Sequence, residues 1–470
     1  MMNEALRDRF IAIVGEKNAL VAEADVAPHL REWRGYWTGR TAAVLKPAST
    51  AEVSAILALA SETGTPVVPQ GGNTGLVGGQ IPDDSGRAIV LSTSRLDRIR
   101  DIDTDGNTLT VEAGAVLQTI QQAADEQDRL FPLSLGAQGS CQIGGNLSSN
   151  AGGTGALAYG VARDLCLGLE VVLPTGEVLD DLNRLKKNNT GYDLRDLFIG
   201  AEGTLGVITA AVLKLFPKPR GRAAAFVAVP SPEAALALFR AARAAAGPSL
   251  TAFELMARMG IAFTLRHVDG TRDPLAAPHD WYVLMEISSG RSEEDARAQL
   301  DALVEAGFEQ GLVLDGTIAE SEAQRLALWH LRESMSESQI PEGGSIKHDI
   351  SVPVASIPAF LQRADRAVLD IVPAARLCPF GHMGDGNLHY NVSQPEGWDR
   401  QRFLAMTGEV TAAVHAIVTE MDGSISAEHG VGQMKRDKLV EVKSPVALDL
   451  MRRIKTAFDP AGIMNPGKML

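Results

Sequence analysis

The chain has 470 residues, 45% of them hydrophobic and 22% charged, which is the composition of a soluble globular protein. This length exceeds what one hydrophobic core usually serves, so we expect two or three domains. The net charge of −14 and the scattered basic residues argue against nucleic acid and against an anionic membrane surface as partners.

Three further features bear on the compartment. Residues 1–14 have neither a secretory apolar core nor the acid-free composition of a transit peptide, and no apolar run reaches membrane-spanning length. The three cysteines show no CxxC spacing, so neither a disulfide framework nor a Cys-based zinc site is indicated. We predict a cytoplasmic protein without a membrane span.

In chain order, residues 1–36 are expected to form a peripheral helical segment. A strand, a helix and a second strand follow, and the helix is predicted to start at Ser49 with Glu52 as a capping box and to stop at Gly64. Pro217 and Pro219 then break the pattern, and we place a domain boundary there. The strands predicted before this boundary are 42–45, 66–68, 88–91, 108–112, 169–173, 178–179 and one that ends near residue 216, with helices at 49–64 and 116–126.

Beyond the boundary, strands and helices alternate up to residue 421, and a helical segment closes the chain. The strands predicted there are 224–229, 282–287, 311–314 and 345–352, with helices ending at 246 and covering 292–306, 319–338, 357–371 and 400–421. In the strand 345–352, alternation places His348 on one side and Lys347 and Asp349 on the other.

Two tracts of small residues mark the first domain. Pro69–Gly79 carries five glycines, whose free N–H groups could form a nest for phosphate oxygens, although glycines also simply make turns. It lacks the GxGxxG spacing of a Rossmann site and the GK[ST] of a P-loop. Gly136–Gly153 is a second tract, too long for a structureless loop unless it wraps something. Together they suggest an extended ligand with a pyrophosphate.

The stretch Pro379–Asn391 places two histidines around a tight polar turn. If Gly384–Asn387 is a four-residue turn, His382 and His389 stand directly opposite, with Cβ atoms about 5 Å apart. One metal ion could take a nitrogen from each, although an ordinary polar pair is also consistent with the pattern. Glu428 is a candidate third ligand, and His429 beside it is left to act as a base.

Two basic residues of the second domain are candidates for binding carboxylates. Arg332 lies on the predicted helix 319–338, where Ser336 shares its face four residues on, and Lys347 lies on the strand that follows. Taken singly, each of these charges is more often a solvated surface charge.

Six motifs, in order from about Trp37, resemble the vanillyl-alcohol-oxidase type of flavoenzyme. More narrowly they resemble the FAD-linked D-2-hydroxyacid dehydrogenases, most of all the hydroxyglutarate branch. The motifs are the tracts 69–79 and 136–153, the corner 189–206, the hairpin 381–389, Ser426–Gly430 and the ending Met464–Lys468. The resemblance implies an α+β fold with a PCMH-type FAD-binding domain at 37–217, an α/β cap or substrate domain with the metal hairpin at 218–421, and a C-terminal segment, 422–470, that returns to the flavin.

The same resemblance implies that the FAD pyrophosphate lies on the first tract and the flavin against the second. Some relatives attach the flavin through a histidine of the first tract, but Gln70–Gly75 contains none, so we predict non-covalent FAD. The residues implied in FAD binding are Pro69, Gly71, Gly72, Asn73, Thr74, Gly75, Leu76, Ser140, Gly144, Gly145, Asn150, Gly152, Gly153, Gly203, Gly206, Ile208 and Asn465.

The resemblance also carries the metal ligands onto His382, His389 and Glu428. Zinc fits such a set, as manganese and cobalt do. Ser336 stands where the family often has threonine and retains the hydroxyl. The substrate contacts that the resemblance implies are Arg332, Ser336, Lys347, Asn391 and His429.

We therefore predict oxidation of a D-2-hydroxy acid, in the first place D-2-hydroxyglutarate and also D-malate, to the 2-oxo acid. His429 is expected to accept the hydroxyl proton, since an imidazole with an ordinary pKa near 6.5 suits that task, while hydride passes to flavin N5. Arg332, with Lys347 and Ser336, is expected to hold the distal carboxylate. The resemblance implies an electron-transfer flavoprotein or a quinone as acceptor, and a homodimer is consistent with it.

Three other interpretations stay open. A D-lactate or glycolate dehydrogenase of the same family needs no clamp for a distal carboxylate. A metallohydrolase could use the His-His-Glu set with a nucleotide on the glycine tracts. A non-catalytic flavin-binding subunit would bind FAD that no hydroxy acid reduces.

Overall fold

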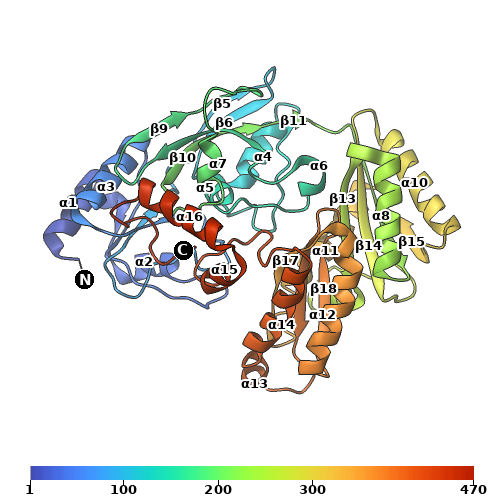
Figure 1. Cartoon of the computed structure of the whole chain (residues 1–470). Coiled ribbons are helices and arrows are strands. Elements are labelled where there is room, and N and C mark those ends of the chain that lie inside the picture. Colours follow the sequence, from blue (N-terminus) through green and yellow to red (C-terminus); the bar gives the residue numbers. More distant parts are fainter. Residues whose placement is uncertain (1) are drawn as a thin grey trace. The chain divides into compact units, whose positions relative to one another are not determined.

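The computed structural model describes residues 2–470 (Figure 1). The chain divides into two compact units. The first comprises the chain up to Gly152, Gly160–Lys218 and Glu428–Leu470; the second comprises Gly153–Tyr159 and Pro219–Ala427. Met1, part of the predicted N-terminal helical segment, lies outside the described residues.

The first unit opens with a small sheet in the order β1-β2-β4-β3, in which β2, β4 and β3 are parallel. The helix α3 begins after Ser49, whose Oγ accepts a hydrogen bond from the Glu52 N–H, and ends at Gly64 in the left-handed conformation, as the sequence predicts. The elements are α1 (Glu4–Val14), β1 (Ala19–Leu20), α2 (Glu23–Leu30), β2 (Ala43–Leu45), α3 (Thr50–Thr63), β3 (Val67–Gln70) and β4 (Ile89–Ser92).

A second, antiparallel sheet of the first unit has the order β5-β6-β10-β8-β9. The C-terminal segment belongs to this unit, where Lys455 Nζ donates to the Thr204 carbonyl at 2.7 Å. The elements are β5 (Ile99–Asp103), β6 (Thr108–Glu112), α4 (Leu117–Asp125), β7 (Arg129–Leu130), α5 (Ile143–Ser148), β8 (Cys166–Val172), β9 (Val178–Asp181), α7 (Arg195–Phe198), β10 (Val207–Lys214), β11 (Phe216–Pro217), α15 (Arg436–Val442) and α16 (Pro445–Phe458).

The second unit is built on one antiparallel sheet in the order β15-β12-β14-β13-β18-β19-β16, with β17 also paired to β19. Helices α8 and α10 pack against β12 and β14 (Figure 1), and α9 and α11 contribute Ile261, Phe263, Leu328 and Leu331 to the core on the other face. The strands are β12 (Gly221–Val229), β13 (Leu250–Ala257), β14 (Trp281–Ser289), β15 (Asp315–Ile318), β16 (Ser345–Ile346), β17 (Asp349–Ser351), β18 (Arg376–His382) and β19 (Asn387–Ser393). The helices are α6 (Ala156–Tyr159), α8 (Pro232–Ala246), α9 (Arg258–His267), α10 (Glu293–Glu309), α11 (Glu322–Glu333), α12 (Ile357–Ile371), α13 (Arg400–Leu404) and α14 (Thr407–Glu420).

Several predicted elements need correction. The strand predicted at 311–314 is a turn, because Gly311 has a φ of 66°, and β15 starts only at Asp315. The strand predicted at 345–352 is two short strands, because His348 leaves the ladder and its ring nitrogen Nδ1 bonds the Tyr390 carbonyl instead. The tract 136–153 is not all loop but contains α5. The strand β13 and the helix α9 were not predicted.

No helix among residues 2–470 is both long enough and apolar enough to span a bilayer. The cytoplasmic location stays a prediction.

Candidate active site

A cleft in the first unit is lined by both glycine tracts. It encloses about 890 Å³ of empty space, part of it open to solvent. The predicted FAD residues that line it are Pro69, Gly71, Gly72, Asn73, Thr74, Gly75, Gly144, Gly145, Gly203, Gly206 and Ile208. The predicted residues outside this lining, in the part of the chain that the structure describes, are Leu76, Ser140, Asn150, Gly152, Gly153 and Asn465.

The residues of this cleft fit a bound FAD. A Cβ added at Gly145 would meet no atom within 4 Å, so this position opens into space rather than into protein. Asn146 Oδ1 is buried and has no hydrogen-bond partner among residues 2–470, although the residue lines the cleft. Such a buried acceptor calls for a partner that a ligand can supply. A Cβ at Gly72 would lie 2.0 Å from the Ser140 carbonyl oxygen, so only glycine lets the two tracts meet.

Sequence reasoning missed Glu202, which also lines the cleft. Its two carboxylate oxygens accept hydrogen bonds from the N–H groups of Val431 and Gly432, each at 2.7 Å. Burial raises the pKa of this carboxyl above its usual range, against the opposing effect of those N–H groups. His429, two residues before Val431, lines the same cleft. The predicted base is thus held beside the predicted flavin site.

Two further predicted FAD residues have structural partners in the first unit. Asn465 Nδ2 donates to the carbonyls of Gly79 and Glu202, at 2.9 and 2.8 Å, and so ties the C-terminal segment to the first tract. Asn150 Oδ1 accepts from the Arg163 N–H at 3.0 Å. Direct FAD contact by these residues stays a prediction.

In the second unit, strand register gathers polar groups on one sheet face. Phe380 of β18 pairs with His389 of β19, and Cys378 with Asn391. His382 follows Phe380 by two residues and therefore shares its face. The ring centroids of His382 and His389 are 5.8 Å apart, and each ring offers a nitrogen within 4.8 Å of the other's.

The predicted register of this hairpin is wrong. His389 pairs with Phe380 rather than with His382, because the turn occupies Met383–Gly386 and β19 starts at Asn387. The Gly386 N–H bonds the His382 carbonyl at 3.2 Å, which closes the turn. The two histidines still approach one another, since a shift of two residues keeps both side chains on the same face.

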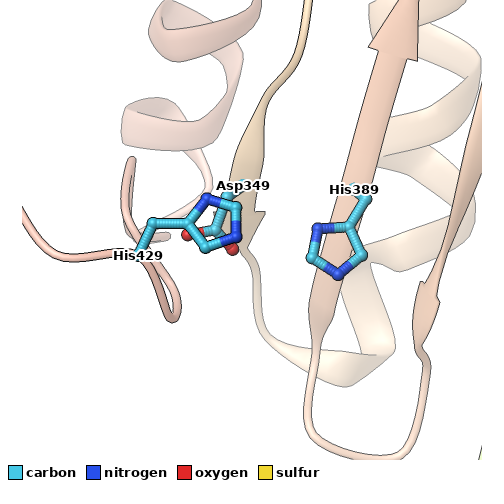
Figure 2. Close-up of side chains that lie close together, drawn as sticks. All are labelled: Asp349, His389 and His429. Atoms are coloured by element: carbon cyan, nitrogen blue, oxygen red, sulfur yellow. The ribbon is translucent and has the colours of Figure 1, made fainter. Parts of the chain in front are cut away.

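Asp349 is an acidic residue on this sheet face to which the sequence analysis gave no role. It lies on β17 directly opposite His389 (Figure 2), and one of its carboxylate oxygens is within 4.8 Å of a His389 ring nitrogen. Its Oδ1 also accepts from Asn387 Nδ2 at 3.0 Å. The alternation of the segment 345–352 already placed Asp349 on the Lys347 side, but no spacing rule linked it to the hairpin.

Sequence reasoning also missed Glu254, which lies on β13 directly opposite His382. Glu254 Oε1 is 2.8 Å from His382 Nδ1, and Oε2 is 2.9 Å from Arg332 Nε and 2.7 Å from Arg332 Nη2. Burial alone would raise the pKa of this carboxyl, but the charges of His382 and Arg332 outweigh it and lower the pKa to about 2. The sequence did contain a signal for this residue, because Glu254 is an acidic residue within the otherwise apolar run Leu250–Ala257.

The predicted carboxylate-binding residues have defined positions. Arg332 is 5% exposed and its guanidinium lies 4.8 Å from the centre of the Phe380 ring. Lys347 Nζ donates to the Ser336 carbonyl at 2.9 Å, so these two residues are neighbours. Asn391 is buried, and its Oδ1 has no hydrogen-bond partner within residues 2–470. Arg332 is therefore not a solvated surface charge.

Glu428 follows directly on Ala427, whose N–H bonds the carbonyl of Asp349 at 3.3 Å. Within the first unit, a Cβ at Gly152 would lie 2.8 Å from Glu428 Oε1, so the carboxylate lies against the second glycine tract. Two imidazoles and a carboxylate, the side-chain types predicted as ligands, suit a divalent ion such as zinc.

Comparisons with known proteins agree with this architecture. A family model described as "FAD linked oxidases, C-terminal domain" matches residues 218–469, and an "FAD binding domain" model matches residues 41–181. The chain is 39% identical over 464 residues to the probable mitochondrial D-2-hydroxyglutarate dehydrogenase of Oryza sativa subsp. indica, covering 98% of this chain and 81% of the relative. It is 39% identical over 446 residues to D-2-hydroxyglutarate dehydrogenase of Xanthomonas citri pv. viticola, covering 95% and 93%.

Another relative is the D-2-hydroxyglutarate–pyruvate transhydrogenase of Saccharomyces cerevisiae, which is 35% identical and covers 98% of this chain and 93% of its own length. Among solved structures, p-cresol methylhydroxylase with substrate bound superimposes with a TM-score of 0.74 at 16% identity, covering 99% of this chain and 96% of that one. This likeness confirms the predicted fold.

Proposed function

This chain belongs to the D-2-hydroxyglutarate dehydrogenase family of FAD-linked oxidases, and we propose that it oxidises D-2-hydroxyglutarate to 2-oxoglutarate with non-covalent FAD and a divalent metal ion. The observation that carries the metal and the dicarboxylate is the sheet face of the second unit. There Glu254 contacts His382 and the buried Arg332, and the ring of His389 lies beside that of His382.

The cleft residues would hold FAD, which would supply a hydride acceptor for C2 of the substrate, and a divalent ion would supply Lewis-acid activation of the substrate hydroxyl. His382 and His389 would hold that ion together with Glu428, whose assignment comes from the sequence motif. His429 accepts the hydroxyl proton, a role that its position in the lining of the flavin cleft supports.

Arg332 selects a dicarboxylate in this proposal. Its Nε donates to Glu254 Oε2, whereas its buried Nη2, 2.7 Å from the same oxygen, has no hydrogen-bond partner among residues 2–470. A second carboxylate can supply that partner. Ser336, Lys347 and Asn391 support the same carboxylate or the adjoining oxygens. Asn391 is buried, and its side-chain NH2 group can donate a hydrogen bond to a substrate oxygen. D-malate is the second candidate substrate.

The electron acceptor is proposed to be an electron-transfer flavoprotein or a quinone. The name of the yeast relative includes pyruvate, so pyruvate is a third acceptor to test against the reduced protein. A homodimer stays a prediction from the sequence resemblance.

Anaerobic titration of the purified, zinc-loaded protein with D-2-hydroxyglutarate tests this function. We expect stoichiometric bleaching of the flavin absorbance, no bleaching with the L isomer, and loss of the reaction after removal of the metal with a chelator. Bleaching that survives complete metal removal would contradict the metal requirement. A yellow protein that D-lactate reduces but D-2-hydroxyglutarate does not would contradict the substrate, and a colourless one that takes up no added FAD would favour the metallohydrolase.

A further inference from the structure

We propose that Glu254 is a positioning residue whose single carboxylate fixes both the metal-binding ring of His382 and the substrate-binding guanidinium of Arg332. This inference rests on the proposed function, since it takes His382 as a metal ligand and Arg332 as the carboxylate clamp. It adds a residue that no sequence motif pointed to, on a strand that was not predicted.

The contact with His382 decides which ring nitrogen binds the metal. Register places Glu254 of β13 directly opposite His382 of β18, and Oε1 lies 2.8 Å from Nδ1. A carboxylate only accepts hydrogen bonds, so Nδ1 must carry the proton and Nε2 keeps its lone pair. An outer carboxylate of this kind orients a ligating histidine and raises its basicity. His382 would therefore hold the metal through Nε2.

The contact with Arg332 fixes the other end of the substrate. Oε2 pairs with Nε and Nη2, and the guanidinium is stacked on Phe380, the residue paired with the second histidine, His389. Glu254 is 1% exposed, so its charge is compensated by these two partners and not by solvent. One carboxylate thus sets the positions of the metal ligand and the clamp together.

Replacing Glu254 with glutamine should disrupt this arrangement without changing its size. The amide oxygen pairs best with the charged Arg332, which turns the NH2 group toward His382. Nδ1 must then accept a hydrogen bond, so the proton moves to Nε2 and blocks the nitrogen that binds the metal. If the new amide takes the opposite orientation, its NH2 group faces the Arg332 guanidinium, and Arg332 is no longer held in position.

A second buried Glu–Arg pair, between the same helix α11 and the same sheet, offers a matched control. Arg325 of α11, two turns before Arg332, pairs with Glu286 of β14 at 2.6 Å, and Glu286 also accepts from Trp329 Nε1. Glu286 is 8% exposed, and within residues 2–470 its carboxylate bonds no histidine. Glu286→Gln therefore breaks a buried Glu–Arg pair that anchors α11, without touching the proposed metal ligand.

The experiment measures the zinc dissociation constant of the FAD-loaded protein by competition with a fluorescent chelator. Glu254→Gln is expected to raise this constant about 10–100-fold, and Glu286→Gln to leave it within about twofold of wild type. Equal increases in both variants would overturn the inference, because they would show a general loss of helix anchoring. A wild-type constant in folded Glu254→Gln protein would also overturn it.

Two further variants separate the inference from the proposed function. His382→Ala must weaken zinc binding; if it does not, the metal site itself is wrong and the inference falls with it. If His382→Ala loses zinc while Glu254→Gln retains it, only the inference fails. Should Glu254→Gln not fold, Glu254→Asp replaces it, since its shorter side chain cannot reach both partners. A severalfold weaker zinc affinity supports the inference, and an unchanged one overturns it.

Discussion

Replacing Gly145 with valine is expected to give folded, colourless protein that lacks FAD. Gly145 lines the cleft, and an added Cβ would meet no protein atom within 4 Å, so the new side chain occupies space meant for the ligand. The helix α5 should tolerate the change, since glycine is the weaker helix former by a few tenths of a kcal/mol. Flavin absorbance of the purified protein, with a thermal unfolding curve, measures both effects.

Gly136 offers the control for this substitution. It lies on the same tract, a Cβ there would also meet nothing within 4 Å, and it is not among the cleft-lining residues. Gly136→Val protein should therefore remain yellow and active. Full FAD content in Gly145→Val would show that the cofactor lies elsewhere and would contradict the assignment of this cleft.

The flavin half of the site could be predicted from sequence because its signal is local. Two tracts of small residues, 69–79 and 136–153, carry their own evidence, and the cleft is lined by parts of both. Glycine also marks close backbone approaches, as at Gly72 against Ser140. The helix α5, which lies within the second tract, was not predicted from these local patterns.

The other half of the site, with the predicted metal ligands and Arg332, depends on how strands distant in the sequence pair. Local sequence patterns do not determine that pairing. The hairpin was predicted two residues out of register because the turn was placed one residue too late. Glu254 was missed because it lies on β13, more than a hundred residues before its partner His382. The residue types at 382, 389 and 332 were nevertheless informative, since imidazole and guanidinium groups within a sheet need hydrogen-bond partners wherever the strands place them.

Replacing Arg332 with methionine is expected to lower kcat/KM for D-2-hydroxyglutarate about 10²–10³-fold, and that for D-lactate about tenfold or less. Losing a buried charge pair with the substrate's distal carboxylate costs about 3–4 kcal/mol, and each 1.36 kcal/mol is about tenfold in rate. D-lactate has no distal carboxylate to lose. Methionine keeps apolar bulk over Phe380, and steady-state kinetics with both substrates measure the ratio.

Only the ratio between substrates is diagnostic, because Arg332 also compensates Glu254. Removing it leaves a buried carboxylate beside His382, which destabilises the fold by about 3–5 kcal/mol and slows both reactions. Arg325 lies on the same helix as Arg332 and pairs with Glu286 of β14. Arg325→Met therefore carries a similar stability cost without changing the carboxylate-binding residue. We expect Arg325→Met to leave the substrate ratio unchanged. Equal losses for both substrates in Arg332→Met would mean that the arginine only supports Glu254, and would favour a D-lactate or glycolate dehydrogenase.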